Sequence, residues 1–258
     1  MLSAEPAFVG IDPTAGERPM HVAVLDRELR VTALSAGDME SALALVAGLE
    51  RAVVAVDAPQ SPNRGLMLRP EVRRRFNLRP GTATWGQWKL CEYELRRRNL
   101  RLYNTPAREQ DAPRWMRVGF ELYRRLWGLG FRFYEAGEPA APRTMLEVHP
   151  HACFGALLER RPFLKQTLEG RLQRQLALYR QGLDLRDPLQ VLEEITPHHL
   201  LTGQVPLTGL HTHDALDALA AAYTAYLAGV KPGQVCQVGD PEEGLITLPA
   251  ARLLDHYT

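Results

Sequence analysis

The segment 51–59, RAVVAVDAP, constrains the fold more than any other part of the chain. Its apolar residues form an unbroken run without polar alternation, and three of the five are β-branched valines. A strand of this composition has both faces covered, which is the usual environment of a parallel strand. Parallel strands need long crossover connections, so we predict an α/β fold with helices on both faces of the sheet.

Three more strands are predicted ahead of this run. Residues 7–11 are a short apolar segment, and residues 21–26 and 29–35 alternate around a DRE turn, as in an antiparallel meander. A helix is predicted after Asp38, which is a suitable N-cap. The order β-β-β-α-β is typical of the opening of a mixed RNase H-like sheet. We therefore predict one such domain over residues 1–258.

Acidic residues stand where these apolar segments end. Asp12 follows the first predicted strand, Asp57 follows the fourth, and Glu147 ends a later one, RTMLE. Asp214 and Asp217 are three residues apart, so they share one face of a predicted Ala-rich helix. Strands one and four are neighbours in the predicted sheet, so their carboxylates should emerge at one edge of a crevice.

Clustered carboxylates beside buried strands repel one another, and a hard divalent cation is the most favourable way to neutralise their charge. We therefore predict bound Mg²⁺ or Mn²⁺. Simpler roles remain open for each residue: Asp12 and Asp57 as turn residues, Asp214 as a helix-dipole partner, and Glu147 as an ion-pair partner. The predicted catalytic residues are Asp12, Asp57, Glu147, Asp214 and Asp217.

Positive charge is concentrated in one segment of a nearly neutral chain. Residues 64–132 hold 16 Arg and 1 Lys against 6 acidic residues, a net charge of +11, which leaves −10 for the remainder. All four tryptophans lie there too. We predict a basic, Trp-containing helical insertion over 60–130, with one helix over 85–98 and another over 112–129. We expect it to bind nucleic acid, with pairing to the acidic body as the alternative. The predicted substrate-binding residues are Arg73, Arg74, Arg96, Arg98, Trp85 and Trp88.

Four motifs together resemble a known family: GID at 10–12, VDAP at 56–59, EVHP at 147–150 and HDALDALAAA at 213–222. They look like the predicted RNase H-like nucleases of domain-of-unknown-function family 429. The last motif is also similar to the closing helix of bacterial Holliday-junction resolvases. The resemblance spans residues 7–228 or so.

The resemblance implies a hydrolase that cuts phosphodiester bonds by a two-metal carboxylate mechanism, with the ions about 3.5–4 Å apart. It implies metal ligands at Asp12, Asp57, Asp214 and Asp217. Two departures stand out. Asp57 takes a place where resolvases usually have Glu, and Glu40 is the only nearby candidate for the Glu that RNase H enzymes carry on their first helix.

Two other functions stay open. GIDPTAG at 10–16 is similar to a phosphate loop of actin-like nucleotide-dependent phosphotransferases, although that class has a second glycine-rich loop and no Gly-Gly pair occurs here. The other is a catalytically inactive RNase H-fold scaffold or binding protein. The HxH pairs, His149 with His151 and His211 with His213, lack a second ligand pair at zinc spacing, so we expect solvated or hydrogen-bonded histidines.

The cell compartment is predicted from absent signals. The chain has no apolar stretch of membrane-spanning length and no recognisable signal peptide. Its three cysteines are an odd number without CxxC spacing, which favours reduced thiols. We expect a cytoplasmic protein with no membrane partner. The sequence leaves its oligomeric state open.

Overall fold

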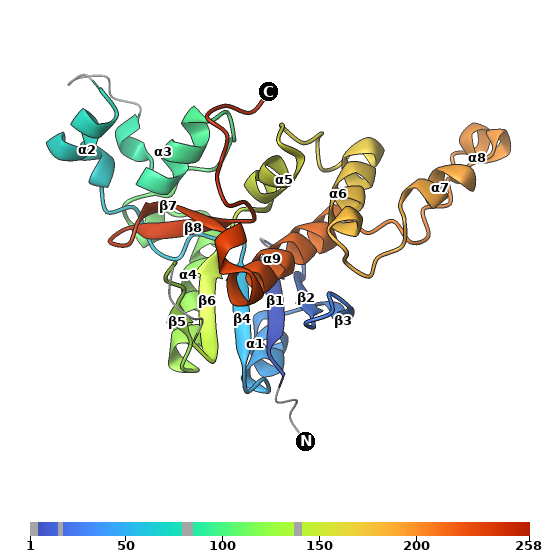
Figure 1. Ribbon diagram of the computed structural model, residues 1–258, viewed down its shortest axis with the longest axis horizontal. Coiled ribbons are helices and arrows are strands. Elements are labelled where there is room, and N and C mark those ends of the chain that lie inside the picture. The colour runs from blue at the N-terminus through green and yellow to red at the C-terminus, as the bar shows by residue number, and fades with distance from the viewer. Residues whose placement is uncertain (1–4, 15–17, 79–84, 137–140) are drawn as a thin grey trace.

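The computed structural model describes residues 5–14, 18–78, 85–136 and 141–258, so the last two residues of GIDPTAG lie outside it. The described strands form one mixed sheet in the order β3-β2-β1-β4-β6-β8-β7, with β5 also paired to β6 (Figure 1). The strands are β1 (Ala7–Asp12), β2 (Met20–Leu25), β3 (Val31–Gly37), β4 (Ala52–Val56), β5 (Arg132–Phe133), β6 (Arg143–Glu147), β7 (Cys236–Asp240) and β8 (Gly244–Leu248).

The predicted α/β class and the β-β-β-α-β opening are confirmed. Strand β4 is the 51–59 run, it is buried throughout, and it lies between parallel neighbours β1 and β6. Strands β2 and β3 add to β1 as an antiparallel meander. The predicted adjacency of strands one and four is therefore correct, and their carboxyl ends meet at one edge.

Helices cover both faces of the sheet (Figure 1). Helices α1 and α4 cover one face of the sheet and form a core with the β1 and β4 side chains on that face. Helices α5, α6 and α9 form the other core, with α9 crossing the middle of the sheet. The helices are α1 (Met39–Ala47), α2 (Pro70–Arg75), α3 (Leu90–Arg97), α4 (Arg114–Gly128), α5 (Pro150–Leu158), α6 (Leu168–Arg180), α7 (Leu189–Glu193), α8 (Pro197–Thr202) and α9 (His213–Val230).

Helix α9 lies unusually close to the sheet. A Cβ at Gly10 in β1 would stand 2.0 Å from the Ala218 carbonyl oxygen and 2.3 Å from the Ala222 nitrogen. Only glycine fits such a backbone-to-backbone approach. The alanines of α9 and this single glycine therefore bring Asp217 within reach of the strand ends.

The predicted basic insertion is structurally mixed. Its helix α4 belongs to the core, since Leu122 and Leu126 are fully buried beneath the sheet. Helices α2 and α3 lie together at one end of the molecule, and α7 and α8 project from the other (Figure 1). The single helix expected over 85–98 is divided, because the Glu92 carboxylate accepts the Lys89 backbone N–H at 3.0 Å and starts α3 there.

None of the helices in the described ranges is long and apolar enough to cross a membrane. The three cysteines are free thiols, as the sequence predicted, and Cys91 and Cys153 are buried.

Candidate metal centre

The alternation of side chains along β1 and β4 decides which face their terminal acids occupy. Phe8 of β1 and both Val53 and Ala55 of β4 belong to the core beneath α9. Asp12 and Asp57 continue the same alternation, so both point to the α9 face. Asp57 follows β4 directly, and its backbone N–H donates to the Ile11 carbonyl at 2.9 Å, which ties the two strand ends together.

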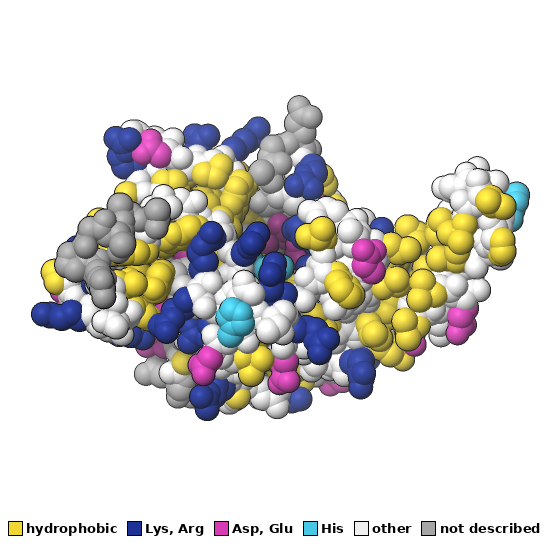
Figure 2. Space-filling view, turned by 90° about the horizontal axis from the view of Figure 1, so that it is seen from above, with side chains coloured by type: hydrophobic (Ala, Val, Ile, Leu, Met, Phe, Trp, Pro, Cys, Tyr) yellow, Lys and Arg dark blue, Asp and Glu magenta, His cyan; other side chains and the backbone are white. Residues whose placement is uncertain are grey.

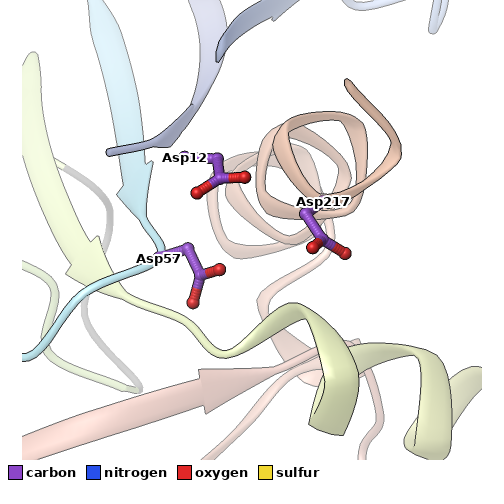
Figure 3. A group of neighbouring side chains, drawn as sticks. All are labelled: Asp12, Asp57 and Asp217. Carbon is purple, nitrogen blue, oxygen red and sulfur yellow. The ribbon is translucent and has the colours of Figure 1, made fainter. Parts of the chain in front are cut away.

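Three carboxylates converge at this edge. Asp12, Asp57 and Asp217 each offer an oxygen, and these oxygens lie within 4.8 Å of one another. Figure 3 shows the first two pointing from the strand ends toward Asp217 on α9. Asp217 is 2% exposed and Asp12 is 8% exposed. The grouping brings together three of the four metal ligands that the resemblance implied.

Burial and mutual repulsion make these acids hard to ionise. Burial, followed by the repulsion of Asp217, raises the pKa of Asp12 to about 8. Burial and the charges of Asp12 and Asp217 raise the pKa of Asp57 well above its usual range. Burial also raises the pKa of Asp217, against the opposing attraction of Lys165. Such a set of repelling acids favours a cation at its centre.

A lysine supplies part of the missing positive charge. The Lys165 ammonium, from the loop between α5 and α6, lies 2.6 Å from Asp217 Oδ2. Burial disfavours its charged form, but the attraction of Asp217 outweighs this and raises the pKa of Lys165. No sequence pattern points to this residue, because no motif surrounds it and it is 52 positions from its partner.

Asp214 lies at the rim, outside the converging group. Its Oδ1 is 2.8 Å from His213 Nδ1, and its Oδ2 is 3.4 Å from the Arg18 guanidinium. Its role as a direct metal ligand stays a prediction. Glu40, the candidate first-helix acid, pairs with Arg125 at 3.0 Å and its side chain is 71% exposed, so it takes no part in the cluster.

Asp12, Asp57 and Asp214 border a hollow of about 280 Å³. Figure 2 looks onto this edge of the sheet: Lys and Arg side chains surround a central hollow in which acidic and histidine side chains are visible. Its lining residues are Asp12, Pro13, Thr14, Arg18, Asp57, Tyr103, Trp115, His149, Lys165 and Asp214.

His149 is a further functional candidate that the sequence analysis did not select. It is the N-cap of α5, and its Nδ1 accepts the Ala152 N–H at 3.3 Å. This agrees with the prediction that these histidines are solvated or hydrogen-bonded. Burial, followed by the charge of His151, lowers the pKa of His149 to about 3. The ring is therefore neutral, with its proton on Nε2, and it presents a hydrogen-bond donor rather than a charge.

Glu147 is not part of the carboxylate group. It pairs in register with Val56 and shares the alternation of Met145, which belongs to the core on the opposite face. There its carboxylate accepts the Gln60 N–H at 2.9 Å and lies 3.9 Å from the buried Lys89 ammonium. This buried pair fits the ion-pair alternative better than a catalytic role in the cluster.

The arginines predicted to bind substrate differ in how far they are already engaged. Arg73 donates to the Leu68 carbonyl and stacks 5.2 Å from the Trp85 ring. Arg96 lies 4.1 Å from the ring centre of Trp88. These contacts are within the segment itself.

Two more of the predicted arginines form a useful contrast. Arg98 is half-buried and donates to the Glu94 carbonyl at 2.7 Å. Arg74 is exposed, and its side chain has no hydrogen bond, ion pair or ring contact within the described ranges. Substrate binding by any of these residues stays a prediction.

A family model described as "Protein of unknown function (DUF429)" matches residues 10–243. The match covers most of the chain, so the protein belongs to this family, as the four motifs indicated. Comparison with curated proteins and with solved structures gave no match.

Proposed function

We propose that this protein is a divalent-metal-dependent nuclease with RNase H-like topology. The observation that carries the proposal is the convergence of Asp12, Asp57 and Asp217, whose oxygens lie within 4.8 Å at the carboxyl ends of two adjacent parallel strands. The sheet order supports it: an antiparallel meander, a central parallel pair and a helix closing over them are the arrangement expected of that fold.

The donor set fits Mg²⁺ or Mn²⁺. All three converging groups are carboxylates, which hard cations prefer. The side chains of Asp12 and Asp57 have no hydrogen-bond or ion-pair partner among the residues that the structure describes. A bound divalent cation would lower the pKa of water and neutralise charge on a phosphodiester.

The remaining residues of the hollow fit a phosphate substrate. Lys165 and Arg18 provide positive charge beside the acids, which would otherwise repel a phosphodiester. The neutral His149 is suited to donate from Nε2 to a phosphate oxygen. Trp115, half-buried beside Tyr103 with ring centres 4.7 Å apart, offers an aromatic wall for a base or sugar.

An inactive scaffold is the main competing function, and one observation favours it. The Lys165–Asp217 ion pair already compensates part of the buried charge without any metal. The phosphotransferase alternative gains no such support, because the Thr14 hydroxyl is already hydrogen-bonded to the carbonyls of Arg18 and Pro19.

The test is a cleavage assay with purified full-length protein on single-stranded, duplex and branched DNA and on RNA. We expect cleavage with millimolar Mn²⁺ or Mg²⁺ and none with EDTA. Asp57→Asn should reduce the rate by about 100-fold or more, because it removes a charged ligand from the cluster.

The matched control is Asp184→Asn, which changes an exposed aspartate outside the cluster and should leave the rate unchanged. Unchanged cleavage in Asp57→Asn, or cleavage that persists in EDTA, would contradict the metal-dependent proposal. A folded wild-type protein that cuts none of these substrates would favour the scaffold.

A further inference from the structure

Lys165 lies in a loop that is held against α6 by hydrogen bonds and close backbone packing. The Phe163 N–H donates to Gln173 Oε1 and the Phe163 carbonyl accepts from Arg174, both at 2.8 Å. The Leu164 carbonyl oxygen lies so near Gly170 that a Cβ there would stand only 1.8 Å away. The loop is therefore fixed on α6, and its lysine reaches the carboxylates from a defined position.

Only some of the carboxylate oxygens in the cluster are available to bind a metal ion. Asp217 Oδ2 is engaged by the Lys165 ammonium at 2.6 Å, and both oxygens of Asp214 are in contact with His213 and Arg18. Among the described residues, nothing hydrogen-bonds to either oxygen of Asp12, to either oxygen of Asp57 or to the second oxygen of Asp217. Asp12 is 8% exposed, has no side-chain partner in the described chain, and points into the group (Figure 3).

This set suits one ion better than two. An ion bound at about 2.1 Å holds oxygens up to about 4.2 Å apart, so small side-chain rotations would bring the three acids around one centre. A second ion about 4 Å away would need several further oxygens and would stand beside a fixed ammonium. Repulsion between this second ion and the Lys165 ammonium, in a half-buried site, opposes the binding of the second ion.

We propose that Lys165 takes the place of a second metal, so that the cluster binds a single divalent cation. The charges agree: the four aspartates, Asp12, Asp57, Asp214 and Asp217, carry −4, and Lys165 and Arg18 return +2, which leaves the charge that one divalent ion balances. This inference rests on the proposed metal-dependent function and revises the number of ions that the family resemblance implied.

The experiment is a calorimetric titration of Mn²⁺ into the metal-free full chain at pH 7. We expect one ion per wild-type chain. Lys165→Met frees Asp217 Oδ2 and removes a repelling charge, so the first ion should bind about tenfold tighter or more. A second equivalent of Mn²⁺ should also appear. Lys165→Arg keeps the charge and should retain the wild-type stoichiometry.

The matched control is Lys231→Met, the same change at an exposed lysine at the far end of α9, and it should bind Mn²⁺ as the wild type does. Two ions in the wild type would overturn this inference and leave the metal-dependent function standing. Unchanged affinity and stoichiometry in Lys165→Met would make the lysine merely structural and also overturn it. No Mn²⁺ binding at all would overturn both proposals.

Discussion

Asp12 combines deep burial with a carboxylate that has no hydrogen-bond or ion-pair partner in the described chain. In the absence of metal its charge is a cost to the folded state, which the raised pKa of about 8 expresses. The pKa in the unfolded chain is near 3.8, so the folded state holds the proton more tightly between these values. The contribution of this group to stability is therefore complete below pH 4 and is lost as the pH rises through 8.

Asp12→Asn should remove that cost. At pH 8 in EDTA we expect the variant to be more stable than the wild type by several kcal/mol, with the difference shrinking toward zero near pH 4. Denaturant unfolding across this pH range measures the difference. A variant less stable than the wild type at pH 8 would show that the carboxylate has a structural partner.

The site was only partly predictable at this scale. The sequence predicts Asp12, Asp57 and Asp217 because each stands at a strand end or on a small-residue helix face, and the structure brings them together. The face that Glu147 occupies depends on its register with Val56, and no sequence pattern gives a register between separate strands. Lys165 could not be selected either, since its role depends only on where its loop folds.

Elements were predicted well where periodicity or burial was strong. The apolar residues of β4 and the Ala-rich α9 require buried positions, and both elements formed as expected. The helix expected over 85–98 was divided because a buried carboxylate, Glu92, caps a backbone N–H within it. A cap of this kind inside residues 85–98 leaves the spacing of the apolar residues unchanged. Hydrophobic periodicity therefore cannot predict where α3 begins.

Gly10 makes a sharp test of how α9 sets the site. Gly10→Ala places a methyl group within 2.0 Å of the α9 backbone, so the helix must move or the strand must bend. We expect the free energy of unfolding to fall by about 1–3 kcal/mol and Mn²⁺ affinity to fall with it. Thermal unfolding and Mn²⁺ titration measure the two effects.

The control for this change is Gly128→Ala in α4, where an added Cβ meets nothing within 4 Å. It should be neutral or slightly stabilising, because alanine is the better helix former. If Gly10→Ala behaved like this control, α9 would not be held against β1 as closely as described.

At the scale of the whole molecule, charge is unevenly distributed along the chain: residues 64–132 carry +11 and the remainder carries −10. If the segment grips nucleic acid, its unengaged arginines should matter most. Arg74→Ala should therefore lower the slope of log affinity against log salt concentration by about one unit, with the melting temperature unchanged.

The comparison is Arg98→Ala, which loses the bond to the Glu94 carbonyl and should lower the melting temperature while changing the salt slope less. Fluorescence anisotropy on duplex and branched DNA over a range of salt concentrations separates the two effects. Equal salt slopes for the wild type and Arg74→Ala would place the nucleic-acid contact elsewhere on the surface.

The docking of α9 on β1 and β4 also has a consequence for the order of assembly. Asp12 and Asp57 come from the first quarter of the sequence, whereas Asp217 comes from a helix about 160 residues further along. While the nascent chain is still emerging, two of the acids can stand side by side, but the third has not yet been made. The cation site therefore cannot form during early synthesis, and a cation bound there would join the first strands of the fold to a helix made much later.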